Sequence, residues 1–216
     1  RLVYENPRKS DRVDAEYLAK LLRLDVSLLS PVEHRSEAAQ KHLAVLRSRD
    51  SLVQARTQLI NHARGMVKSF GGRLPNCGAE SFARKAHPAL PDELRPALEL
   101  ILETIQAVTD HIRSYQQEIE RVCEQEYPET ANLRQIKGVG ALTALAFVLT
   151  IEDPARFSTS REVGPCLGLV PKRDQSSDDD PQGHITKTGD PYLRRLLIGG
   201  ADLTLTRNAE GDLKLS

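Results

Sequence analysis

The sequence predicts a mainly α-helical protein, and three observations support this prediction. Apolar residues make up 39% of the 216 residues and aromatic residues only 4%, with no Trp, so we expect a core of Leu, Ala, Val and Ile, which suits helices. Apolar residues recur every seven positions over residues 39–67. They follow a 4-3-4-3 spacing over residues 94–122, which is typical of a coiled coil.

Charge, hydropathy and cysteine content exclude several classes of protein. Lys and Arg number 30, as do Asp and Glu, so the zero net charge gives no overall indication of nucleic-acid binding, although local charge can be segregated. The longest nearly apolar run, residues 141–151, is shorter than the roughly 20 residues that a membrane helix needs. The three cysteines form no zinc or disulfide motif. We therefore expect a cytoplasmic protein without a membrane segment.

The first predicted helix covers residues 10–24, with Ser10 or Asp11 as its N-cap. Its apolar face consists of Val13, Tyr17, Leu18, Leu21 and Leu22. Asp11 and Asp14 lie three residues apart and share a face, where paired carboxylates can hold Mg²⁺. Two acids are too few for a complete site, and such pairs are common on solvated helices. The chain begins at Arg1 with no signal pattern, so we expect a fragment that is cut at both ends.

Two long helices are predicted next. The first covers residues 33–70, and its apolar repeat consists of Ala39, Leu46, Val53, Ile60 and Val67. Leu43, Ala63 and Phe70 are predicted as intermediate contacts. Asp50 and Thr57 are polar residues at seam positions. The second begins near Pro91 and carries Leu94, Leu98, Ile101, Ile105, Val108, Ile112, Tyr115, Ile119 and Val122.

Charge indicates how these helices pair. Residues 33–73 carry eight Lys or Arg against three Asp or Glu, whereas residues 91–129 carry three against ten. Residues 71–91, rich in Gly and Pro, are predicted to be a connector without an element of their own. Opposite charge and a folding-back linker favour a long antiparallel coiled-coil hairpin over residues 33–128. Such a hairpin can serve as a structural spacer or as the arm through which a homo-oligomer forms.

Residues 129–216 are predicted to form a compact helical domain. Within it, Gly138-Val139-Gly140 and its flanking apolar residues have the spacing of a helix-hairpin-helix. The glycines let backbone N–H groups approach a ligand, so this turn can hold a DNA phosphate without reading sequence. The alternative is a tight helical turn around a small core.

The segment from Pro171 to Leu197 is the most informative part of this domain. Ser176 and Ser177 lie in a polar loop, and a Lys187-Thr188-Gly189 turn follows. Asp190 then has the place of an N-cap and Pro191 that of the first helical residue, with Arg194 and Arg195 on the helix. A serine beside basic residues and a helix N-terminus can attack or bind a phosphate, although a Ser- and Asp-rich loop is more often only solvated. His184 is a weak candidate for a base.

The motifs occur in an order that resembles a known family. They are Ser10-Asp11-Arg12-Val13-Asp14-Ala15-Glu16, Leu59-Ile60-Asn61-His62-x-Arg64-Gly65, Gly138-Val139-Gly140, Leu167-Gly168-Leu169-x-Pro171, Asp174-Gln175-Ser176 and Ile185-Thr186-Lys187-x-Gly189-Asp190-x-Tyr192-Leu193-Arg194. This set resembles the insertion-sequence transposases that have a RuvC-like DEDD domain and a C-terminal serine-bearing domain, related to the Piv invertases.

The resemblance implies a function and residues that perform it. Residues 1–32 would be the C-terminal remnant of the RuvC-like domain, with Asp11 and Asp14 as two of four metal-binding acids and the other two upstream of Arg1. Ser176 would be the nucleophile, with Ser177 where the family usually has Gly. Lys187, Arg194, Arg195 and the glycine turn would bind double-stranded DNA. The implied activity is DNA strand exchange by a homo-oligomer with Mg²⁺ and a noncoding guide RNA.

One alternative remains open. A helical DNA- or RNA-binding protein from a decayed element would keep the hairpin and the glycine turn without the chemistry.

Overall fold

The computed structural model describes residues 10–26, 35–172 and 183–212 of the chain. They belong to two compact units, one ending at residue 35 and one beginning at residue 36. As predicted, the elements of the described residues are helical, and the β pairing among them is an isolated bridge between Pro171 and Ile185. No helix in the described ranges combines the length and apolarity needed to cross a membrane.

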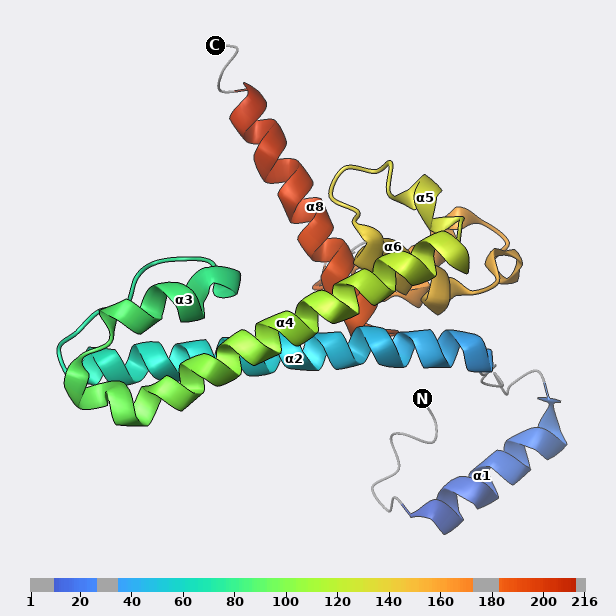
Figure 1. The fold of residues 1–216 in the computed structure, drawn as a ribbon. Coiled ribbons are helices and arrows are strands. Elements are labelled where there is room, and N and C mark those ends of the chain that lie inside the picture. The colour runs from blue at the N-terminus through green and yellow to red at the C-terminus, as the bar shows by residue number, and fades with distance from the viewer. Residues whose placement is uncertain (1–9, 27–34, 173–182, 213–216) are drawn as a thin grey trace. The chain divides into compact units, whose positions relative to one another are not determined.

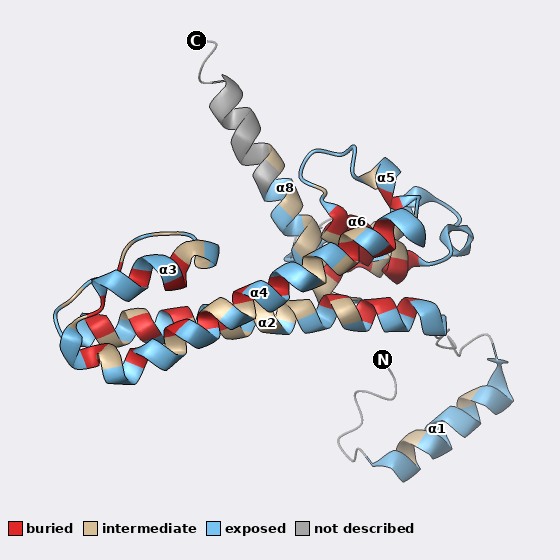
Figure 2. Ribbon diagram, in the orientation of Figure 1, coloured by how far each residue is buried: buried red, intermediate tan, exposed pale blue. Residues whose placement is uncertain are grey.

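The first unit contains helix α1 (Asp11–Leu24). The predicted N-cap is confirmed as Ser10, whose Oγ accepts a hydrogen bond from the Val13 N–H at 3.4 Å. No residue of α1 is buried (Figure 2). Leu18 and Leu22 on the predicted apolar face are about half exposed.

The second unit is built around two long antiparallel helices, α2 (Glu37–Ser69) and α4 (Arg95–Gln125), which run side by side in Figure 1. The end of α2 packs on the beginning of α4 through Ile60, Ala63, Val67, Leu98, Leu102 and Ile105. The beginning of α2 packs near the end of α4 through Ala39, Leu43, Leu46, Ile119, Val122 and Cys123. The predicted antiparallel pairing is therefore confirmed.

The seam of the hairpin is less regular than the apolar repeat predicted. Between the two apolar clusters the Arg56 guanidinium is buried and donates a hydrogen bond to Thr109 Oγ1 at 3.4 Å. Burial lowers the pKa of Arg56 because it penalises the charged form. Phe70, predicted as an apolar contact, is 63% exposed, so that prediction is wrong. The repeat ends with Val67 because α2 ends at Ser69.

The prediction that residues 71–91 form only a connector is also wrong. This segment folds into η2 (Ala79–Ser81), α3 (Phe82–Ala86) and η3 (His87–Ala89), and η4 (Asp92–Leu94) follows before α4. Phe82 is fully buried and Ala86 is buried beside it, in the same cluster as the end of α2. Burial of the Phe82 ring explains why so short a helix is stable.

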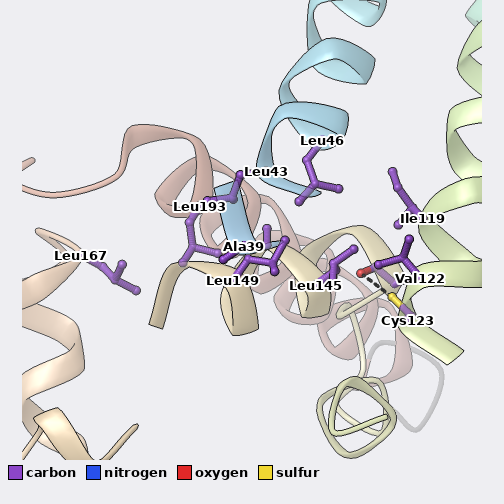
Figure 3. Close-up of a cluster of buried hydrophobic side chains, with 12 residues drawn as sticks. Ala39, Leu43, Leu46, Ile119, Val122, Cys123, Leu145, Leu149, Leu167 and Leu193 are labelled. Carbon is purple, nitrogen blue, oxygen red and sulfur yellow. Dashed lines mark hydrogen bonds between the residues drawn. The ribbon is translucent and has the colours of Figure 1, made fainter. Parts of the chain in front are cut away.

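The remaining helices are α5 (Thr130–Leu133), α6 (Ala141–Ile151), η5 (Pro154–Arg156), η6 (Ser160–Glu162), α7 (Val163–Cys166) and α8 (Pro191–Asp212). Helix α6 is apolar on all sides and lies in the core, where Leu145 and Leu149 are fully buried (Figure 3). That core also contains Leu193 of α8 and the hairpin residues Leu46 and Ile119. The C-terminal helices and the hairpin thus share one core.

Candidate functional site

The predicted nucleophile Ser176 and its neighbour Ser177 lie in residues 173–182, outside the described residues. The chain on both sides of this segment is described. The Lys172 N–H donates to the His184 carbonyl oxygen at 2.9 Å, and the Thr186 N–H donates to the Val170 carbonyl oxygen at 2.9 Å. Together with the bridge between Pro171 and Ile185, these bonds hold both ends of the segment next to each other. We call residues 173–182 the serine loop.

Two glycines, one on each side of the serine loop in the sequence, allow the backbone segments that flank it to approach each other closely. Gly168 and Gly189 both have positive φ, at 66° and 77°. A Cβ at Gly168 would overlap the backbone of Thr188, and one at Gly189 would overlap the carbonyl oxygen of Cys166. Neither position accepts a side chain without a backbone shift.

Arg194, predicted to contact DNA, makes internal hydrogen bonds at this place. Its Nη1 donates to the Leu167 carbonyl oxygen at 3.0 Å and to the Thr188 carbonyl oxygen at 2.8 Å. The guanidinium therefore joins the end of α7 to the turn that precedes α8. Lys187, with a φ of 56°, is exposed at the same turn.

The beginning of α8 is capped as predicted. Asp190 Oδ1 accepts hydrogen bonds from the N–H groups of Tyr192 at 2.8 Å and Leu193 at 3.1 Å, and Pro191 is the first helical residue. These N–H groups are no longer available to a phosphate, and Asp190 itself is negative. The positive charge offered to a phosphate at this turn comes from the Lys187 side chain rather than from the helix N-terminus.

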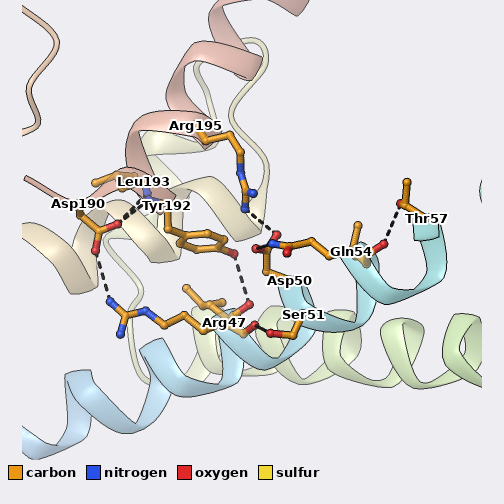
Figure 4. Close-up of polar contacts among 11 residues, drawn as sticks. Arg47, Asp50, Ser51, Gln54, Thr57, Asp190, Tyr192, Leu193 and Arg195 are labelled. Atoms are coloured by element: carbon orange, nitrogen blue, oxygen red, sulfur yellow. Dashed lines mark hydrogen bonds and ion pairs between the residues drawn. The ribbon is translucent and has the colours of Figure 1, made fainter. Parts of the chain in front are cut away.

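Two ion pairs connect α8 to the middle of α2 (Figure 4). Asp190 Oδ2 lies 3.5 Å from Arg47 Nη2, and Arg195 Nη2 lies 2.6 Å from Asp50 Oδ1. The hydrogen bond with Asp50 is the main cause that raises the pKa of Arg195. Asp50 thus faces α8, which explains the carboxylate in the apolar repeat. The sequence shows the irregularity at Asp50 but not its partner, which is 145 residues away.

Tyr192 supplements these ion pairs. Its hydroxyl donates to the Leu46 carbonyl oxygen at 3.4 Å, and the Arg195 guanidinium lies over its ring at 5.4 Å from the centroid. Burial raises the pKa of Tyr192 to about 12, with a further contribution from the nearby Asp50 carboxylate. The tyrosine is therefore neutral at physiological pH and serves as a structural contact.

The predicted DNA-binding turn has one closed and one open side. Gly138, with a φ of 91°, lies against α8, and a Cβ there would be 2.5 Å from the Gly200 carbonyl oxygen. Thr204 Oγ1 of α8 also donates to the Lys137 carbonyl oxygen at 2.8 Å. Gly140, the N-cap of α6, has open space where a Cβ would lie. The Cβ direction is therefore blocked by α8 at Gly138 and open at Gly140. Val139, between them, is partly buried.

Asp11 and Asp14 both lie in the first turn of α1, as predicted. Asp14 Oδ1 is shielded from solvent and accepts no hydrogen bond within the described part of the chain. A buried carboxylate oxygen without a donor suits a cation ligand. The described residues contain no group of three or more His, Cys, Asp or Glu side chains placed to hold a metal ion. The pair therefore fits part of a Mg²⁺ site and not a whole one.

Comparisons with known proteins are consistent with these observations. A family model described as "Transposase IS116/IS110/IS902 family" matches residues 130–214, and a transposase model of the IS110 DEDD type matches residues 1–71. The first match covers the serine loop and the glycine turn, and the second covers the Asp11 and Asp14 pair.

Similar proteins come from several bacteria. The transposase for insertion sequence element IS1111A of Coxiella burnetii is 30% identical over 205 residues, which is 92% of this chain and 55% of the relative. The transposase for IS1328 of Yersinia enterocolitica is 30% identical, and a probable family 20 transposase of Pseudomonas aeruginosa is 29% identical; each match covers 92% of this chain and 60% of the relative. The chain thus spans 55–60% of the length of these relatives.

Proposed function

We propose that this chain is a member of the IS110/IS116 family of transposases and part of an enzyme that cleaves and rejoins DNA strands when an insertion sequence moves. The observation that supports this most directly is the base of the serine loop. Its ends are fixed side by side, and the turn that follows carries an exposed lysine. A loop that carries a nucleophile needs this kind of rigid support, because small misplacement of a reacting atom is costly.

Ser176 is the nucleophile in this proposal. Its Oγ forms a bond to the phosphorus of a DNA phosphodiester, the bond from phosphorus to a sugar oxygen breaks, and the leaving sugar oxygen takes up one proton in exchange for the proton that the serine hydroxyl releases. The covalent link preserves the energy of the broken bond for rejoining. Lys187 supplies positive charge for the phosphate, while Arg194 holds the turn before α8 and Arg195 holds α8 on α2 through internal contacts.

Asp11 and Asp14 contribute two carboxylates to the proposed Mg²⁺ site. The unsatisfied oxygen of Asp14 supports this role. Mg²⁺, when bound, would offset negative charge at the phosphate. What the chain itself provides is the helical turn that holds the two acids on one face.

Double-stranded DNA is the proposed partner of the glycine turn, through its backbone and at the Gly140 side. The open space at Gly140 supports this contact. The proposal also includes a noncoding guide RNA and a homo-oligomer formed through the α2–α4 hairpin; both depend on the resemblance to the family.

The experiment compares two serine variants in the complete transposase with its DNA and guide RNA. Ser176→Ala is expected to abolish covalent protein–DNA adducts and recombination. Ser177→Gly restores the residue usual in the family and is expected to preserve or increase both. Adducts that survive Ser176→Ala but disappear in Ser177→Ala would refute the assignment. DNA binding without adducts in the parent protein would favour the non-catalytic alternative.

A further inference from the structure

A cationic cavity of about 750 Å³ lies at the tip of the hairpin, where α2 ends. Three cations line it, Arg64, Lys68 and Arg73, and no carboxylate does so among the described residues. Arg64 is fixed, because its Nη2 donates to the Cys77 carbonyl oxygen at 3.4 Å and its guanidinium lies 5.1 Å from the centroid of the Phe82 ring. We call this the tip cavity.

The surroundings of the tip cavity are also positive. Residues 61–90 contain five Lys or Arg and one acid, Glu80. Lys68 and Arg73 are exposed, and neither forms an ion pair with another described residue. Cations that converge on a cavity without neutralising carboxylates repel one another and attract an anion. The tip cavity therefore favours a ligand that carries several negative charges.

An exposed aromatic residue directly precedes the tip cavity in the sequence. Phe70 is 63% exposed and is followed by Gly71, which lines the tip cavity. Gly71 has a φ of 78° and open space around its Cβ position, so it places no side chain between the ring and the cavity. An exposed phenyl ring next to convergent cations is the combination with which proteins bind unpaired nucleotides, since a base stacks on the ring and the cations contact the backbone.

We propose that the hairpin tip binds an unpaired stretch of nucleic acid, with backbone phosphates in the tip cavity and a base stacked on Phe70. A duplex would use the cations but not the ring, because its bases are already stacked. An acidic peptide would likewise leave the ring without a partner. This inference goes beyond the strand transfer proposed above, since it needs no covalent step and lies at the other end of the hairpin from the shared core.

The test measures fluorescence anisotropy of labelled 20-nucleotide DNA and RNA of one mixed sequence, each single-stranded and as a duplex, over a series of salt concentrations. Lys68→Gln and Arg73→Gln are each expected to weaken single-strand binding and to reduce the slope of log K against log salt by about 0.7. Lys41→Gln is the matched control: it makes the same change on the same helix at an exposed site far from the tip. It should leave the slope unchanged.

Variants of Phe70 test whether a base stacks on its ring. Phe70→Leu keeps an apolar side chain and is expected to lower single-strand affinity at least about five-fold, whereas Phe70→Tyr should retain it. A preference for the RNA or the DNA strand identifies which nucleic acid the tip binds. Equal losses in Lys68→Gln and Lys41→Gln, or an unchanged affinity in Phe70→Leu, would overturn the inference. These measurements need no covalent adduct, so failure here is distinct from failure of the proposed chemistry.

Discussion

Replacing Gly138 by Ala tests the packing of the glycine turn on α8. The φ of 91° at this residue lies in the region that L-residues rarely adopt. The new methyl carbon would also lie 2.5 Å from the Gly200 carbonyl oxygen and 2.7 Å from Thr204 Oγ1. The first of these contacts is to backbone, so side-chain rotation cannot relieve it.

The expected loss of stability follows from three contributions. Positive φ costs an L-residue roughly 1–2 kcal/mol, and forcing a methyl group into packed space costs roughly 1–3 kcal/mol. Replacing glycine also reduces the conformational freedom of the unfolded chain, which stabilises the folded state by roughly 0.4–1 kcal/mol. The free energy of unfolding should therefore fall by about 3 kcal/mol in Gly138→Ala.

Gly140→Ala is the control two residues away. Gly140 has an extended backbone, with φ −90° and ψ 178°, and nothing lies near its Cβ position. Alanine is a poor N-cap, so a loss below about 1 kcal/mol is expected. Urea denaturation followed by circular dichroism gives both values from the midpoints, provided that the slope is unchanged. Equal midpoints for the two variants would refute the packing argument.

A further variant of the glycine turn tests DNA binding without a large loss of stability. Gly140→Val should fold, because the space is open, but its side chain should block close approach of a DNA phosphate. Affinity for random duplex at fixed salt should therefore fall in Gly140→Val. An affinity equal to that of the parent would show that DNA does not contact the turn at this residue.

The other predictions concern the hairpin, its link to α8 and the acid pair. Ile105→Asp should sharply reduce helicity or self-association, because Ile105 is fully buried. Leu100→Asp on the same helix should not, because Leu100 is 70% exposed. Equal circular dichroism spectra of the two variants would contradict the pairing of α2 with α4. A double-mutant cycle on Asp50 and Arg195 should give a coupling of about 0.5–1 kcal/mol, since the pair is partly exposed; zero coupling would disprove the link. Calorimetry should detect only weak Mg²⁺ binding to this chain, and Asp14→Asn should abolish it. Tight binding would mean that the Mg²⁺ site is elsewhere.

The sequence predicts a helix where an apolar repeat extends over many turns or where a capping side chain lies within a few residues of the helix end. The hairpin follows from an apolar repeat sustained over many turns, and the caps at Ser10 and Asp190 follow from side chains that bond N–H groups two or three residues ahead. Helix α3 was not predictable, since five residues are too few for periodicity and glycines and prolines flank them. Its stability comes from tertiary burial of Phe82.

The site was only partly predictable for a related reason. The motifs indicate candidate segments, but a long cationic side chain can bind DNA or bond its own backbone, and the sequence does not distinguish the two. Arg194 uses its guanidinium on two carbonyl groups, and Arg195 pairs with a residue of α2. Lys187 remains exposed. Distinguishing these three residues requires the fold.

The hairpin fixes the distance between the tip cavity and the ion pairs that hold α8 on α2. Helix α2 is continuous from Asp50, which pairs with Arg195 of α8, to its end next to Phe70. Twenty residues of helix at 1.5 Å per residue separate these points by about 30 Å. Because α2 and α8 share one core and two ion pairs, a strand bound at the tip would be held at this fixed spacing from the beginning of α8 and not on a flexible tether.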